Sequence, residues 1–507
     1  MSELDQKQDF EDFSFEEQIE IVRKSPFPER ADLILRSQYP ETIIEDLGPE
    51  NFYIIARSAD RELLPELLSY ADTDQLLFFT DFQCFESDKV NPRKFTYWIR
   101  QLMEASHEKF LEWVSEMDFD FIVTGYKKVI RIIKSTPEEV MDEILQDEEY
   151  FTIDFLYYIC LKHSDDFETI KKSIELIFEH LKSLYINLME CVIAEILAET
   201  EEEAYLNREE RLSEAGFPEK EIAVNIYKPL DREEWINLEK KQEKDLKASS
   251  ESSAFSKDVD FMSPIIHRQG SLFIDEVLSF ISQKDHNFRT EIDAEIMSLT
   301  NKVLVLSMQK DHDLGEDILK RALSEVKGML NIALGVLTGN SLQRSAEILT
   351  HYWLEHIFRR GFTEIMFFRK KANGLIKKLR PVNVETFVRF FDNDYACTLK
   401  GLLKLSPKFY DHAVHDNLDS LREFRTMEDI TLTRTRLETI EKTLELLIHI
   451  ENLNVLFDHT RPLNLTPEEV TSRTVLFTAF ANYTLNRSFS ANPLEKDELL
   501  SFFKKGF

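Results

Sequence analysis

Glu347, His351 and Glu355 recur at intervals of four residues. In a helix this spacing places two carboxylates and one imidazole on the same face, where they could hold a divalent metal. A solvated helix face with i, i+4 pairs produces the same spacing, and the sequence carries no second copy of the kind that ferritin-like sites need. We predict no cofactor, and a divalent metal on this face is the alternative.

A second metal-like pattern is formed by His412 and His415, three residues apart, with Asp416 beside them. Two imidazoles at this spacing could chelate a metal together with the carboxylate. The pattern has neither the cysteines nor the HExxH spacing of well-defined zinc sites. An exposed helix or loop end that carries two histidines explains it equally.

Basic residues concentrate between positions 359 and 380, where Glu364 is the only acid. Phe362, Phe367 and Phe368 alternate with them, as in sites that bind phosphates or an acidic partner. The alternative is that the stretch neutralises the chain's own acidic surface and that the phenylalanines are core residues. It is our candidate for partner or phosphate binding, through Arg359, Arg360, Arg369, Lys370, Lys371, Lys377, Lys378 and Arg380.

The charge of the whole chain opposes that local excess, because 62 basic residues face 94 acidic ones and the net charge is −32. Such a balance disfavours binding to nucleic acids or anionic membranes. P-loop, Rossmann, serine-hydrolase and HExxH motifs are absent from the sequence. No apolar run approaches the roughly 20 residues of a membrane span, and the N-terminus is acidic rather than signal-like. With four scattered cysteines, these features predict a cytoplasmic protein with reduced thiols.

Only 12 glycines occur among 507 residues, against 39 phenylalanines. Together with apolar residues at helical spacing, this composition predicts an all-α fold with few or no strands. Short amphipathic bursts near the N-terminus predict an irregular or solenoid-like array of short helices, and one long helix is expected from Lys171 to about Ala198. The expected parts are a flexible acidic tail (1–13), the short-helix array (14–134), a long-helix segment (135–236), a linker (237–260) and a helical C-terminal domain (261–507).

The stretch from Glu201 to Asp231 carries a distinctive series of residues: Glu202, Glu203, Ala204, Tyr205, Arg211, Leu212, Gly216, Phe217, Pro218, Tyr227, Pro229, Leu230 and Asp231. This series resembles the pattern EEAY, RLxxxGFP and YxPLD of a bacterial family of uncharacterised proteins, known only as a domain of unknown function. Two further stretches, Tyr352–Ala372 and Arg461–Leu485, are also similar to it. The resemblance implies bacterial origin and a fold continuous over most of the chain, and it implies no activity.

Within that series, Tyr205, Arg211, Tyr227 and Asp231 could line a polar pocket. The alternative is structural: Gly216, Phe217 and Pro218 would reverse the chain, and Arg211 would pair with Asp231. The sequence as a whole predicts a non-enzymatic, protein-binding or regulatory helical protein. A metal-dependent enzyme or metal sensor is the alternative function.

Overall fold

A computed structural model describes residues 10–135, 150–162, 166–240, 272–284, 286–307, 316–378, 388, 390–404, 406–411, 420–451 and 471–504. Helices make up most of these residues and the strands are short, which confirms the all-α prediction. Most of the expected tail (1–13) and linker (237–260) lies outside the described residues. None of the described helices combines the length and hydrophobicity required to cross a bilayer.

Contacts divide the chain into two compact units. The first unit comprises Met1–Asn225, Ser250–Gly270 and Asp285–Leu323, and the second comprises Ile226–Ser249, Ser271–Lys284 and Ser324–Phe507. Helix α19 (Glu316–Thr338) begins in the first unit and continues into the second. The five-part division expected from the sequence stays a prediction.

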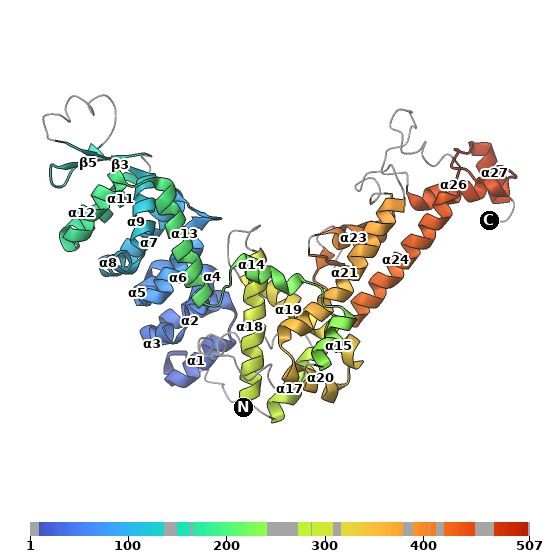
Figure 1. Ribbon diagram of the computed structural model, residues 1–507, viewed down its shortest axis with the longest axis horizontal. Helices are drawn as coiled ribbons and strands as arrows, with labels where there is room; N and C mark the ends of the chain where they lie inside the picture. The colour runs from blue at the N-terminus through green and yellow to red at the C-terminus, as the bar shows by residue number, and fades with distance from the viewer. Residues whose placement is uncertain are drawn as a thin grey trace, which may run out of the picture. The chain divides into compact units, whose positions relative to one another are not determined.

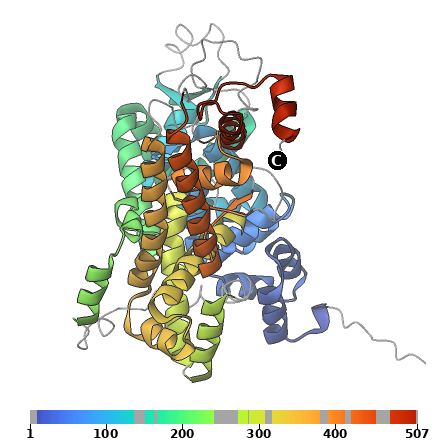
Figure 2. The same cartoon turned by 90° about the vertical axis from the view of Figure 1, so that its right-hand side faces the viewer.

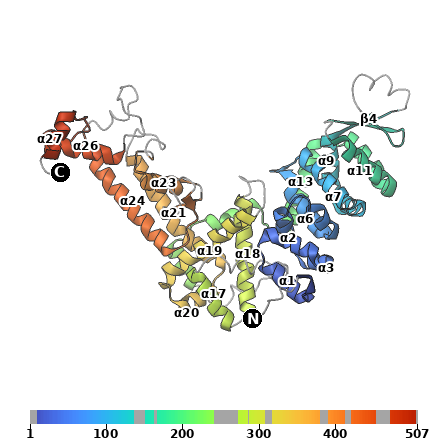
Figure 3. The ribbon, with the colours of Figure 1, turned by 180° about the vertical axis from the view of Figure 1, so that it is seen from behind.

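The first unit begins with short helices that follow one another along the chain (Figures 1 and 3). Capping boxes start two of them, with Ser14 before α1 and Asp72 before α6, and the stacked rings of Phe79 and Trp98 join α6 to α7 with centroids 4.7 Å apart. The short elements are η1 (Phe10–Asp12), α1 (Phe15–Lys24), α2 (Phe27–Arg36), α3 (Pro40–Asp46), α4 (Pro49–Ser58), α5 (Leu64–Tyr70), α6 (Thr73–Gln83), β1 (Phe85–Glu86), β2 (Lys89–Val90), α7 (Pro92–Ala105), α8 (His107–Glu116) and α9 (Phe119–Val129).

A small antiparallel sheet follows α9. Its strands β3 (Ile130–Lys134), β4 (Tyr150–Phe151) and β5 (Tyr157–Leu161) have the order β3-β5-β4, and Ile132 lies opposite Ile159. Strand β5 is buried along most of its length, so its sequence does not alternate between apolar and polar residues. That is why a search for period-2 patterns does not detect it.

The long helix expected from Lys171 to Ala198 is wrong, because the structure divides this stretch among three helices. Helix α11 (Phe167–His180) ends at Leu181, whose φ of −128° and ψ of 55° are not helical, and α12 (Lys182–Ala194) packs back against it. Phe178 and Tyr185 meet edge to face across this bend, with ring centroids 5.0 Å apart. Helix α13 (Leu197–Glu214) follows, then α14 (Lys220–Ala223) and, later in the chain, α18 (His286–Ser307).

The second unit is built on longer helices, and α24 runs alongside α21 (Figure 2). Tyr352 has an extended backbone and separates α20 (Leu342–His351) from α21. A β-carbon at Gly361 would overlap the carbonyl oxygen of Met329, so glycine permits α21 and α19 to approach closely. The elements are η3 (Val224–Tyr227, which straddles the boundary), α15 (Arg232–Lys240), α17 (Phe273–Lys284), α20 (Leu342–His351), α21 (Leu354–Lys378), α23 (Asn393–Leu403), β6 (Phe409–Tyr410), β7 (Leu421–Arg422), α24 (Met427–Ile448), α26 (Ser472–Thr484) and α27 (Lys496–Lys504).

Candidate functional site

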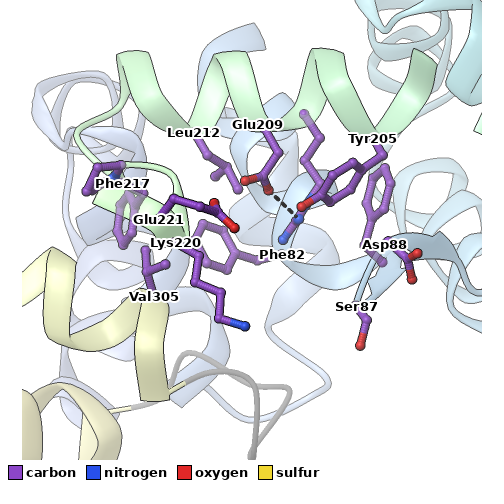
Figure 4. A pocket seen from close by; sticks show the side chains of 13 residues that line it. Phe82, Ser87, Asp88, Tyr205, Glu209, Leu212, Phe217, Lys220, Glu221 and Val305 are labelled. Atoms are coloured by element: carbon purple, nitrogen blue, oxygen red, sulfur yellow. Dashed lines mark hydrogen bonds and ion pairs between the residues drawn. The ribbon is translucent and has the colours of Figure 1, made fainter. Parts of the chain in front are cut away.

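A cavity of about 580 Å³ lies in the first unit beside the C-terminal half of α13 (Figure 4). This size falls within the range of small-molecule binding sites. Its wall combines aromatic, hydroxyl and charged side chains from several elements. The lining residues are Phe82, Phe85, Ser87, Asp88, Tyr205, Arg208, Glu209, Leu212, Phe217, Pro218, Lys220, Glu221 and Val305.

Helix α13 supplies one wall of the cavity. Tyr205, Arg208, Glu209 and Leu212 occupy positions i, i+3, i+4 and i+7, which lie on one face of a helix. The helix ends where Gly216 takes a φ of +86°, a left-handed conformation that favours glycine. The amide of Phe217 then donates to the Leu212 carbonyl at 2.7 Å, which closes the helix end.

The turn after α13 carries Phe217 and Pro218 into the cavity wall. Phe217 is buried, and its ring centroid lies 5.7 Å from that of Phe78 and 5.4 Å from that of Phe82, both on α6. The chain reversal expected at Gly216, Phe217 and Pro218 is therefore confirmed, because α13 ends there. Opposite this turn, the β1–β2 hairpin contributes Ser87 and Asp88.

Some of the charged side chains that line the cavity form hydrogen bonds or ion pairs with other groups of the protein. Arg208 donates from Nε to the backbone carbonyl of Asp81 at 2.8 Å and from Nη1 to Glu209 Oε1 at 3.0 Å, and its guanidinium lies 4.9 Å from the Phe85 ring centroid. Burial raises the pKa of Glu209; Arg208 opposes this shift, and Glu221 adds to it. The cavity thus holds a half-buried carboxylate that already has one cationic neighbour.

Tyr205 is the other titratable group of this wall. Burial raises the pKa of its hydroxyl, and the negative charges of Glu209, Glu221 and Asp88 raise it further, against the opposing effect of Arg208. The phenol therefore stays protonated at neutral pH and can donate a hydrogen bond.

Arg211 lies one turn beyond Arg208 and binds two carboxylates of the first unit. Its Nε and Nη2 donate to Asp81 Oδ2 and Oδ1 at 2.9 and 2.7 Å, and its Nη1 donates to Asp118. Burial lowers the pKa of Arg211, but the hydrogen bonds that it donates to these carboxylates outweigh burial and raise the pKa. The expected pairing of Arg211 with Asp231 is wrong, because Asp81 and Asp118 occupy the guanidinium.

Tyr227 and Asp231 form their hydrogen bonds within the second unit. Tyr227 donates to Glu325 at 2.8 Å, and its ring meets Phe362 with centroids 5.0 Å apart. Asp231 accepts from the amide of Glu234 at 2.9 Å, while the Glu234 carboxylate accepts from the Asp231 amide at 3.0 Å. This reciprocal pair is a capping box at the start of α15, so Asp231 has a structural role there.

The basic stretch from Arg359 to Lys378 lies on α21 and divides into two sets. The first set bonds inside the second unit: Arg359 donates to the Lys228 carbonyl at 2.9 Å, and buried Arg360 donates to Glu364 at 2.8 Å. Phe362 and Phe368 are buried, as the alternative interpretation expected. Arg369 is half-buried, and Arg380 lies outside the described residues.

The second set forms one solvent-facing strip of α21, which we call the α21 basic face. Its members follow helical spacing (i, i+3, i+4, i+7, i+10 and i+11), and Phe367 is 60% exposed. Lys371 and Lys378 each lie 3.0 Å from Glu441 on α24. The α21 basic face consists of Phe367, Lys370, Lys371, Gly374, Lys377 and Lys378.

The metal candidates do not share a helix face. Glu347 and His351 belong to α20, which ends at His351, whereas Glu355 lies in the first turn of α21. His351 Nδ1 lies 2.6 Å from the Glu347 carbonyl oxygen, so this nitrogen caps its own helix. Across the described ranges, no three His, Cys, Asp or Glu side chains are grouped to hold a metal. His412, His415 and Asp416 lie outside those ranges.

Sequence reasoning missed much of the cavity lining and both carboxylate partners of Arg211. Asp81, Asp118, Glu209 and Glu221 were not singled out, because their importance depends on the approach of α6, α9 and α14 to α13. Arg208 could have been found, since it lies three residues before Arg211 and four after Ala204, within the recognised series. Its position on the same face as Tyr205 was the available signal.

A family described as one of unknown function, DUF6178, matches residues 7–507. No curated protein and no solved structure matches the chain.

Proposed function

We propose that this chain, which belongs to the family of unknown function DUF6178, is a cytoplasmic, non-enzymatic interaction protein. It binds an acidic protein partner through the second unit, and the α21 basic face is the contact. The observation that carries this proposal is an exposed aromatic side chain, Phe367, beside exposed Lys370 and Lys377 in a chain of net charge −32. Aromatic side chains are enriched at protein interfaces, and an exposed positive charge favours an acidic partner through electrostatic complementarity.

The buried face of α21 supports this role because its packing fixes the position of the helix. Ile357, Phe358, Ile365 and Leu375 are buried, and Gly361 allows close contact with α19. A face supported in this way is already ordered, so binding costs less side-chain and backbone entropy than binding through a loop.

Two of the four lysines on the face, Lys371 and Lys378, share an ion pair with the single carboxylate of Glu441, and two have no ion pair in the described part of the chain. Hydrogen bonds from Lys378 and Lys371 lower the pKa of Glu441, which keeps that carboxylate ionised. Lys370 and Lys377 are exposed. These two ammonium groups would meet carboxylates of a partner, and electrostatic attraction would speed the encounter.

A second exposed surface of the same unit is consistent with protein binding. Phe477, Phe480 and Tyr483 on α26 are between 44% and 65% exposed, and Leu500 and Phe503 on α27 are about half exposed. The rings of Phe477 and Phe503 lie 6.4 Å apart. Clustered exposed aromatics of this kind commonly mark interaction surfaces.

The alternative function, a metal-dependent enzyme or metal sensor, required Glu347, His351 and Glu355 on one face. The helix break at Tyr352 removes that face, and no other observation favours the alternative. Metal analysis of gently purified protein tests it separately: a stoichiometric divalent metal would restore the metal-sensor proposal.

The test of the interaction is affinity purification from the source cell after nuclease treatment, read by quantitative mass spectrometry. The variant Lys370→Glu with Lys377→Glu should lose a stoichiometric partner. The control, Lys404→Glu with Lys442→Glu, makes the same charge change at exposed lysines of the second unit and should retain it. Equal recovery from both variants, with circular dichroism unchanged, would contradict the proposal.

A further inference from the structure

We propose that the cavity beside α13 binds a small organic cation, an amine or guanidinium joined to an apolar body. This site lies in the first unit and is independent of the α21 basic face, so either proposal can fail without the other. Nothing in the family description assigns a ligand.

The apolar part of the wall suits an aromatic or aliphatic body. Phe82 and Phe217 are buried side chains whose edges reach the cavity, and Leu212 and Val305 close it from α13 and α18. A volume of about 580 Å³ accommodates a small molecule rather than a protein loop. Burial against such a wall would contribute about 25 cal/mol per Å² of apolar area.

The polar part of the wall favours positive charge. Glu209 on α13 and Glu221 on α14 point toward each other, and Asp88 on the hairpin lies across from them (Figure 4). The Tyr205 ring lies between these groups in the same view. An ammonium or guanidinium held there would meet carboxylates and could lie against an aromatic face.

The two basic residues of the wall do not cancel this preference. Arg208 already donates to the Asp81 carbonyl and to Glu209, and Lys220 extends away from Glu209 (Figure 4). With three acids and two bases in the lining, one negative charge remains. The strongly acidic chain adds to the potential that attracts a cation.

The test uses three probes with the same ring and different charge: benzylamine, benzyl alcohol and benzoate. Binding to the full chain is followed by ligand-observed NMR and by thermal shift at millimolar concentration. Benzylamine should bind saturably, and benzyl alcohol and benzoate should not. Saturable binding of benzoate, or no saturable binding of benzylamine, would overturn the proposal.

A matched pair of variants places the binding in the cavity. Glu209→Gln with Glu221→Gln keeps side-chain size and should weaken benzylamine at least about tenfold, which corresponds to 1.4 kcal/mol. Glu202→Gln with Glu210→Gln makes the same charge change on exposed positions of α13 outside the lining and should bind normally. Unchanged binding in the first variant, or equal weakening in both, would also overturn it.

Discussion

Arg211 on α13 forms a two-pronged hydrogen-bonded pair with Asp81 on α6, which precedes it by 130 residues, at 2.7 and 2.9 Å. Asp81 is almost fully buried, and its backbone carbonyl also accepts from Arg208. The same short segment of α6 therefore holds both arginines of α13. One of them lines the cavity, so the pair fixes the wall in place.

Removing this arginine should destabilise the first unit. Arg211→Gln would leave the buried Asp81 carboxylate without its cation, and losing one partner of a buried pair costs about 3–5 kcal/mol. Hydrogen exchange of peptides from α6 and α13 should accelerate, and the melting temperature should fall. Arg93→Gln, at an exposed position of α7, should change neither; similar behaviour of the two variants would contradict the role of Arg211.

Two glycines of α21 should respond in opposite directions to alanine. Gly361→Ala would bring a methyl group against the Met329 carbonyl, and overpacking of this kind costs about 1–3 kcal/mol. Gly374→Ala meets no atom within 4 Å and should stabilise the helix by about 0.5–1 kcal/mol. Thermal melting compares them, and a stable Gly361→Ala variant would show that α19 and α21 are not in close contact.

Glu112 on α8 should make the first unit sensitive to acid. It accepts from the Thr73 hydroxyl at 2.6 Å and from Lys109 at 3.1 Å. Burial raises the pKa of Glu112, but these two hydrogen bonds outweigh it and lower the pKa below 4.5. A lowered folded-state pKa contributes stability above the unfolded-state pKa, and this stability is lost as pH falls through the folded-state value.

The variant Glu112→Gln isolates this contribution. Wild type should melt at a higher temperature than the variant at neutral pH, and the difference should shrink below about pH 4.3. Glu116→Gln, on an exposed position of the same helix, should follow wild type at every pH. A difference that stays constant from neutral to acid pH would contradict the lowered pKa.

The sequence predicted features that depend on neighbouring residues. The end of α13 could be predicted from the sequence, because Gly216 adopts a left-handed conformation and Pro218 cannot extend the helix. The family resemblance, which rested on Glu201–Asp231, is confirmed by the match over residues 7–507.

Features that depend on contacts between residues far apart in the sequence could not be predicted from the sequence. Leu181 interrupts the stretch from 171 to 198 without glycine or proline, since the bend is stabilised by packing of α11 on α12. The partners of Arg211 lie 93 and 130 residues away from it in the sequence. Asp231, only twenty residues after Arg211, was the expected partner because it is closer in the sequence. The basic stretch at 359–380 was treated as one group, because the sequence does not show which of its lysines pair with Glu441.

The most direct test of the interaction proposal is photo-crosslinking from Phe367 in the source cell. Replacing this exposed ring with benzoylphenylalanine keeps an aromatic side chain at the centre of the α21 basic face, and Tyr39 in the first unit, also exposed, is the control position. We expect a crosslink from position 367 to one acidic protein. The crosslink should be absent from position 39 and should be abolished by Lys370→Glu with Lys377→Glu. No crosslinked protein at position 367, or one that persists after charge reversal, would contradict it.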